Sequence, residues 1–241
     1  RRQRQMCIRD RRDTGLARKL TLGVVGAIAL LSAGLVIIAA LVFTNIKSTM
    51  KDVLYDVTLD SYKSVISSEV QSAISITQNY YELFQSGELS ETEAQKKALE
   101  VIRSIRYGED NSGYLWVDGT DYTLIMHPIL PDQEGSNRYE LTDQNGVKII
   151  QEIMKVAEAG GYNEFYFTKS DGVTVAPKVA YSKEFKPWNW VITTGVYSDD
   201  IQNVVDKSDG VIRIGRIFNK AIILMAGVAA LFAVIIAIVA Y

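Results

Sequence analysis

The sequence contains a single histidine, His127, in the stretch DYTLIMHPIL of residues 121–130. It ends an alternating run and stands directly before Pro128, which cannot donate to a strand ladder. An imidazole at such a strand end can donate a hydrogen bond to an anion, which in turn favours the protonated ring. The alternative is a structural histidine that binds the loop from Leu130 to Arg138. No second histidine is available to share a metal ion or a proton relay.

Two basic residues are also suited to an anion. Lys178 lies in a predicted strand, and Thr174, Ala176 and Ala180 are expected on the same face of that strand as the lysine. A lysine among small and apolar residues of a central strand is costly unless it meets an anion. The alternative is a surface strand lysine. Arg106 ends a predicted helix just before the sheet, where a cation is favourable in any case because of the helix dipole.

Phenol and indole groups can complete an anion site. The candidates are Tyr114, Tyr166 and Tyr181, which can each donate a phenolic hydrogen bond, and Trp116, which offers an indole N–H or an apolar wall. Trp188 and Trp190 are interpreted as core or bend residues.

The sequence gives little support for catalysis. It contains no Gly-x-Ser-x-Gly, Walker or zinc-ligand spacing. Asp118 and Asp121 flank a predicted turn and are interpreted as turn residues. The one cysteine, Cys7, cannot form a disulfide within the chain. We therefore expect no enzyme, no metal site and no cofactor.

Two long apolar runs predict membrane-spanning helices. Residues 21–43 and 221–241 carry no charge and are long enough, as helices, to cross a hydrocarbon core of about 30 Å. Residues 1–19 hold eight lysines and arginines and are expected to be cytoplasmic. The segment MCIRDR matches the translation of a common sequencing adapter, so residues 1 to about 12 are interpreted as an artefact and excluded from fold reasoning.

The segment between the runs, residues 44–220, is expected to form an extracytoplasmic domain. It holds 18 basic and 26 acidic residues, a net charge of −8, which argues against nucleic-acid binding. The charges that flank the second apolar run do not fit this orientation. Arg213, Arg216 and Lys220 stand just before the second span on its outer side, although long domains translocate largely regardless of such charges.

Hydrophobic periodicity predicts an α+β domain. A long helix over residues 45–85 continues from the first span and ends at Gly87, and Ser90 with Glu93 forms a capping box for a helix over residues 91–106. A β-hairpin follows Gly108, then a helix over residues 144–159, three strands around a Ser-Asp-Gly turn and the Pro187 bend, and a helix over residues 198–220. This order predicts an antiparallel sheet with helices packed to one side.

Six short blocks follow one another at fitting spacings. They are Gly-Tyr-x-Trp-Val, His-Pro, Asp-x-x-Gly, Gly-Gly-x-x-x-x-Tyr, Pro-Lys-x-x-Tyr and Trp-x-Trp-Val-Ile-x-Thr-Gly-Val-Tyr. Together they resemble the single-Cache sensor domain of bacterial methyl-accepting chemotaxis proteins and sensor kinases, over about residues 47–201. The loop ILPDQEGSN after His-Pro matches this family loosely.

The resemblance implies a PAS-like five-stranded antiparallel sheet on a long N-terminal helix. It also implies a small organic anion as ligand, such as acetate, propionate, lactate or pyruvate, held by residues from the set Arg106, Tyr114, Trp116, His127, Tyr166, Lys178 and Tyr181. The expected protein is a homodimeric chemoreceptor of the bacterial inner membrane, whose cytoplasmic output domain would follow the chain.

Three other interpretations stay open. The domain can be the sensor half of a histidine kinase or a diguanylate cyclase. It can be a membrane-anchored envelope hydrolase with His127 as base, or a structural ectodomain that holds no ligand. A hydrolase would need a nucleophile and an orienting acid, and none of the six blocks supplies either.

Overall fold

The computed structural model describes residues 2–108, 111–169 and 171–240. These residues form two compact units. One unit runs from the N-terminus to Val53 and resumes at Asp206, and the other is Leu54–Val205. The side chains of the first fourteen residues, including Cys7, and Ser170 of the predicted Ser-Asp-Gly turn lie outside what is described.

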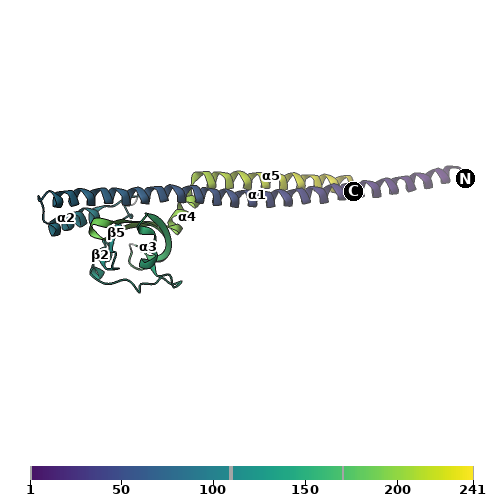
Figure 1. The fold of residues 1–241 in the computed structure, drawn as a ribbon. Helices are drawn as coiled ribbons and strands as arrows, with labels where there is room; N and C mark the ends of the chain where they lie inside the picture. The colour runs from purple at the N-terminus through teal and green to yellow at the C-terminus, as the bar shows by residue number, and fades with distance from the viewer. Residues whose placement is uncertain (1, 109–110, 170, 241) are drawn as a thin grey trace. The chain divides into compact units, whose positions relative to one another are not determined.

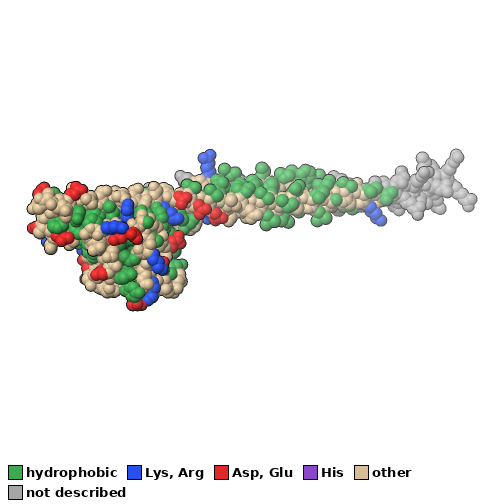
Figure 2. Space-filling view, viewed as in Figure 1, with side chains coloured by type: hydrophobic (Ala, Val, Ile, Leu, Met, Phe, Trp, Pro, Cys, Tyr) green, Lys and Arg blue, Asp and Glu red, His purple; other side chains and the backbone are tan. Residues whose placement is uncertain are grey.

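The unit built from the two ends of the chain contains two helices side by side, drawn purple to blue and yellow in Figure 1. They are the first part of α1 (Arg2–Gln85) and α5 (Asp209–Ala240). The rings of Phe43 and Phe218 stack between them at 4.6 Å. Their surface is rich in exposed apolar side chains, which Figure 2 shows in green. Both helices are long and apolar enough to cross a membrane, as the sequence predicts.

Local sequence signals set the ends of the first two helices. Gly87, with φ of +80°, follows the end of α1, and its N–H donates to the Phe84 carbonyl at 3.0 Å. The predicted capping box is confirmed, because the side chains of Ser90 and Glu93 each accept the other residue's backbone N–H at the start of α2 (Glu91–Ser104). The helix ends two residues earlier than predicted.

The five predicted strands form one antiparallel sheet of order β2-β1-β5-β4-β3. Their bounds are β1 (Leu115–Gly119), β2 (Leu124–Met126), β3 (Gly161–Thr168), β4 (Val175–Phe185) and β5 (Trp190–Tyr197). Two short 3-10 helices, η1 (Pro131–Gln133) and η2 (Lys186–Trp188), lie in the connections. The α+β architecture with a long N-terminal helix agrees with the prediction.

Helices cover both faces of this sheet, so the expectation that they pack to one side was wrong. On one face, α1 and α2 meet strand residues such as Leu115, Val117 and Ile192 in a buried core that also holds Trp188 and Trp190. On the other face, α3 (Ile149–Ala157) packs on residues that include Phe165 and Ala180. The second core arises because α3 is strongly amphipathic and buries Ile149, Ile150 and Ile153.

Two further boundaries differ from prediction. The helix expected from residue 144 begins at Ile149, because the Asp143 carboxylate accepts the backbone N–H groups of Asn145 and Val147 and holds that segment as a turn. The helix expected over residues 198–220 is interrupted at Ser208, between α4 (Ser198–Lys207) and α5.

Candidate ligand-binding site

A buried lysine on β4 lies inside an aromatic cage. The Nζ atom of Lys178 is 4.5 Å from the ring centre of Tyr114, 4.9 Å from Trp116, 4.7 Å from Tyr197 and 5.6 Å from Phe167. Strand register brings these rings together. Tyr197 on β5 is the direct cross-strand partner of Lys178, and Phe167 on β3 pairs with Ala176, two positions before Lys178 on β4. The cage therefore draws on β1, β3, β4 and β5.

The charge of Lys178 is poorly compensated. Its side chain is 1% exposed, and Nζ donates one hydrogen bond, 3.2 Å long, to the phenol oxygen of Tyr114. Among the described residues no carboxylate lies within ion-pair distance of Nζ. Burial lowers the pKa of Lys178, since an ammonium without water or a counter-ion is disfavoured. A small anion inside the cage would supply the missing partner.

His127 lies beside the same rings, one residue after β2. Its imidazole is 0% exposed and has ring-centre distances of 5.3 Å to Tyr114, 5.8 Å to Trp116 and 6.2 Å to Phe167. Its Nδ1 accepts the backbone N–H groups of Ile129 and Leu130, each at 3.1 Å. The structural role that the sequence left open for His127, bonding to the following loop, is thus present at this nitrogen.

The other ring nitrogen of His127, Nε2, is in a different situation. Because Nδ1 is an acceptor, the neutral ring carries its proton on Nε2. This buried Nε2 has no hydrogen-bond partner among the described residues. Burial, followed by the charges of Arg138, Lys178 and Arg103, lowers the pKa of His127 to about 3. The ring is therefore a neutral donor at physiological pH, and it offers an N–H beside the Lys178 cage.

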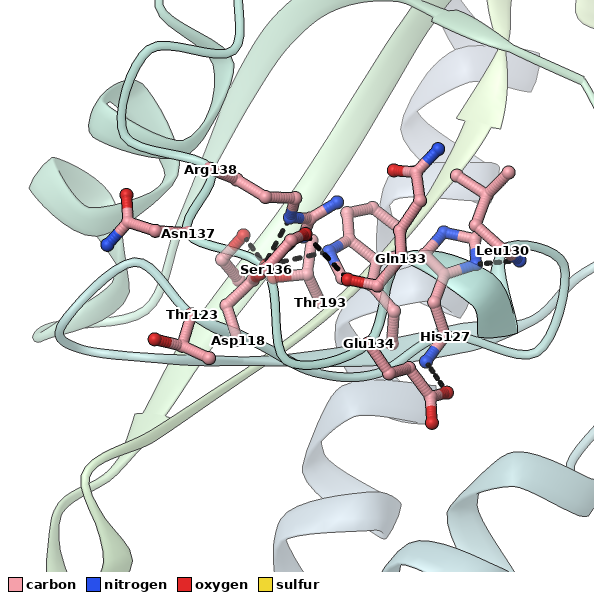
Figure 3. Close-up of polar contacts among 12 residues, drawn as sticks. Asp118, Thr123, His127, Leu130, Gln133, Glu134, Ser136, Asn137, Arg138 and Thr193 are labelled. Carbon is pink, nitrogen blue, oxygen red and sulfur yellow. Dashed lines mark hydrogen bonds and ion pairs between the residues drawn. The ribbon is translucent and has the colours of Figure 1, made fainter.

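Glu134 holds the backbone of His127 in place (Figure 3). Its carboxylate accepts the His127 N–H at 2.8 Å. It also binds the guanidinium of Arg103 on α2 at 2.7 and 2.9 Å. Arg103 also donates to the His127 carbonyl at 3.4 Å. These contacts join the loop that follows β2 to the end of α2, and so fix the direction in which the imidazole points.

A buried ion pair lies next to the cage, and sequence reasoning missed it. Asp118 is 0% exposed and accepts the Arg138 guanidinium, with Nε at 3.1 Å, while its second oxygen accepts the Trp116 indole N–H at 3.0 Å (Figure 3). Burial raises the pKa of Asp118, and the Arg138 charge opposes that shift. The assignment of Asp118 as a turn residue is corrected, whereas Asp121 does stabilise the turn by accepting the Thr123 N–H.

Three of the predicted residues are not brought to the cage. Successive side chains of a strand point to opposite faces of the sheet. Tyr166 follows Phe165, the cross-strand partner of Lys178, and Tyr181 is an odd number of residues from Lys178 on the same strand. Both tyrosine side chains therefore point to the face opposite Lys178. Tyr181 packs there against Tyr162 at 4.8 Å. Arg106 is exposed, and its guanidinium donates to the Arg103 and Ile105 carbonyls. The structure brings together Tyr114, Trp116, His127 and Lys178.

Two cage residues were not among the candidates. Tyr197 is the last residue of the block Trp-x-Trp-Val-Ile-x-Thr-Gly-Val-Tyr, and this signal could have made it a candidate. Phe167 carries no such signal, although it lies on the same strand face as Phe165. Tyr197 is anchored by a hydrogen bond of 2.7 Å to the Thr168 carbonyl. Among the described residues, no group of three or more histidine, cysteine, aspartate or glutamate side chains is placed to hold a metal ion.

Comparisons with known proteins agree on one family. The family model for "Single Cache domain 2" matches residues 59–209. The methyl-accepting chemotaxis protein McpP of Pseudomonas putida is 31% identical over 194 residues, which is 79% of this chain and 33% of McpP. The sensor histidine kinase MctS of Rhizobium johnstonii is 34% identical over 109 residues, 45% of this chain and 23% of MctS. The chain thus spans a third or less of these two relatives.

Solved structures give the same result. A periplasmic sensor domain of a chemotaxis protein matches with a TM-score of 0.55 and 28% identity, over 58% of this chain and 96% of that domain. A Cache chemosensory domain whose structure concerns carboxylic acid recognition matches with a TM-score of 0.53 and 27% identity, over 61% and 97%. With the sheet order, the long helix and the family match over most of the chain, these findings show that the protein belongs to the single Cache domain family.

Proposed function

We propose that this chain is the sensing part of a bacterial transmembrane chemoreceptor that binds a small organic carboxylate outside the membrane. The observation that carries the proposal is the buried Lys178 ammonium, which lacks a carboxylate partner among the described residues and lies in the same ring cluster as the unpartnered Nε2 of His127. A carboxylate has the charge for the first group and an acceptor oxygen for the second.

The affinity of such a site would come from a few hydrogen bonds to the carboxylate. Hydrogen bonds to a charged group contribute about 1.5–3 kcal/mol each. Lys178 and His127 supply two such donors, and the phenol of Tyr114 is positioned to supply a third. Together three of them contribute about 4.5–9 kcal/mol, a range that spans millimolar to micromolar dissociation constants before ordering costs are subtracted.

The closed cage favours a small ligand. Lys178, His127, Tyr114 and Trp116 are each at most 3% exposed. The open groove of about 460 Å³ on the same unit lies elsewhere, along α2, and Arg103 and Glu134 contribute to it. A ligand can therefore reach the cage only when a neighbouring segment opens. Acetate, propionate, lactate and pyruvate are of suitable size, and the carboxylic-acid-binding Cache relative supports this class.

The cage also offers a route for a signal. Tyr197 is both a cage residue and the last residue of β5, and α4 begins at the next residue and leads to α5. Lys169 ties the end of β3 to α4 through Asp199 and Asp200, at 2.9 and 2.6 Å. An anion that draws Lys178 away from Tyr197 would displace the start of α4, and a shift of about 1–2 Å can propagate along a helix. We propose a homodimer as the signalling unit.

Binding can be tested on the compact unit Leu54–Val205 by thermal shift and calorimetry with acetate, propionate, lactate and pyruvate. We expect at least one acid to bind, and Lys178→Ala to abolish that binding while the unit stays folded. Lys183→Ala is the matched control, because Lys183 is on the same strand but faces the other side. If no small carboxylate binds, or if Lys178→Ala binds as well as the wild type, the proposal fails.

A second output remains a candidate, because MctS is a sensor histidine kinase. The same binding unit would then regulate a kinase rather than a chemotaxis signalling domain. Sequencing the gene beyond the codon for Tyr241 separates the two, since a kinase and a chemotaxis transducer have different downstream domains.

A further inference from the structure

The unit formed by the two chain ends contains a groove lined by four basic residues and one acidic residue. Its volume is about 460 Å³, and it lies between the first part of α1 and the start of α5. The residues that line it are Lys47, Lys51, Asp206, Val211, Ile212, Gly215, Arg216, Asn219, Lys220 and Ile223. Lysine and arginine near a membrane span are normally enriched on its cytoplasmic side. Two of the lining residues, Arg216 and Lys220, belong to the basic cluster on the expected outer side, which departs from this rule.

Three of the four cations in the groove have no ion pair among the described residues. Lys51 pairs with Asp206 at 2.6 Å, and Asp206 is the acidic residue of the lining. No described carboxylate lies within ion-pair distance of Lys47, Arg216 or Lys220, and all three side chains are exposed. The groove therefore holds an excess of positive charge on a surface that is otherwise rich in apolar side chains.

The depth of the groove matches the headgroup region of a bilayer. The stacked pair of Phe43 and Phe218 marks the end of the apolar run of α1. Lys47 is one helical turn beyond Phe43, about 6 Å along the axis. Ile223, which is 71% exposed, extends the groove into the apolar run of α5. In a bilayer spanned by the two apolar runs, one end of the groove would lie at hydrocarbon depth and the other at the level of the lipid phosphates.

We propose that this groove binds an anionic phospholipid, with the phosphate between Lys47, Arg216 and Lys220 and an acyl chain along Ile223. Basic pockets between membrane helices are suited to phosphate headgroups, and each lysine or arginine near the surface adds to the attraction. The long stems of these cations pack along apolar surface while their charges reach the phosphate. A bound headgroup would neutralise Arg216 and Lys220, whose position on the outer side of the span is unusual for basic residues. The site is independent of the carboxylate cage.

Native mass spectrometry of the 241-residue chain in detergent micelles tests this proposal with added phosphatidylglycerol and, as a zwitterionic comparison, phosphatidylcholine. We expect phosphatidylglycerol to be retained preferentially, and the double variant Arg216→Gln and Lys220→Gln to retain it about tenfold more weakly. The matched control, Lys207→Gln and Arg213→Gln, removes two exposed cations from the same region outside the groove and should change retention less than twofold. Arg216→Lys with Lys220→Arg keeps the charges and should keep the lipid.

Three results would overturn the proposal. Equal retention of both lipids would remove the role of charge. An equal loss in the control variant would show diffuse attraction rather than a groove. Displacement of the lipid by millimolar inorganic phosphate would identify a free anion as the ligand. Circular dichroism of each variant excludes a loss of helix as the cause. The substituted residues all belong to the unit formed by the chain ends and none lies in the carboxylate cage, so the outcome of these measurements and that of the sensing proposal are separate.

Discussion

The ammonium of Lys178 donates to the phenol oxygen of Tyr114 at 3.2 Å while lying 4.5 Å from the centre of the same ring. The phenol thus provides a hydrogen-bond acceptor and a π face to one buried cation. Neither contact neutralises the charge. A buried charge held by neutral groups alone reduces the stability of the ligand-free domain, and the proposed anion would restore that stability.

Replacing this lysine should therefore stabilise the ligand-free domain. Lys178→Met keeps the length and removes the charge, so we expect the free energy of unfolding of Leu54–Val205 to rise by about 1–3 kcal/mol at pH 7 in urea. Lys183→Met on the opposite face should change it by less than about 0.5 kcal/mol. A marked loss of stability in Lys178→Met would mean that the ring contacts outweigh desolvation.

The buried neutral His127 predicts a pH dependence of stability. The pKa of His127 falls from 6.5 to about 3 on folding, so below pH 6.5 the unfolded chain binds a proton that the folded domain does not. Stability is then lost as the pH falls from about 6.5 towards 3, by about 2 kcal/mol between pH 7 and pH 5. Urea unfolding without ligand at several pH values measures this slope.

The variant His127→Asn separates the contact made by Nδ1 from the binding role proposed for Nε2. An asparagine oxygen can accept the Ile129 and Leu130 N–H groups as Nδ1 does, but its amide cannot reach the position of Nε2 and does not titrate. We expect a folded domain with the pH 7 to pH 5 loss reduced by about 2 kcal/mol and with carboxylate affinity about tenfold weaker. Unchanged affinity would remove Nε2 from the binding site.

The ion pair of Asp118 and Arg138 should be strongly coupled. Arg138→Met leaves a buried carboxylate without its cation and should cost about 3–5 kcal/mol in unfolding free energy. Adding Asp118→Asn removes that charge and keeps an acceptor for the Trp116 indole, so the double variant should recover at least half of the loss. If the effects of the two single variants simply add, the residues do not act as a pair.

Gly195 provides the close approach of β5 to β4 beside the lysine. A Cβ atom there would lie 2.5 Å from the Val179 carbonyl oxygen and 3.0 Å from the Lys178 Cε. Gly195→Ala must shift the strand and the lysine stem, so we expect a loss of about 1–3 kcal/mol in unfolding free energy and weaker carboxylate binding. Urea unfolding measures the stability of Gly195→Ala, and calorimetry measures its carboxylate affinity. If both equal the wild-type values, this packing argument is contradicted.

Much of the fold could be predicted because it depends on interactions between residues close in sequence. The start of α2 follows from Ser90 and Glu93, three residues apart, and the end of α1 from Gly87. The same reasoning placed the start of α3 five residues too early, because one side chain, Asp143, accepts nearby N–H groups and its second oxygen accepts the distant N–H of Tyr166. The spacing of apolar residues does not reveal such a competitor.

The sequence by itself determined the two apolar helices and the five strands, and it made His127 and Lys178 candidate site residues. Only the tertiary structure decided what surrounds them. Strand register brings Phe167 and Tyr197 to the lysine and turns Tyr166 and Tyr181 away, and Asp118 meets Arg138 across 20 positions. The physical reason is that helix and strand periodicity depend on neighbouring residues, whereas the partner of a buried charge depends on how distant strands pair and on which face each side chain then occupies.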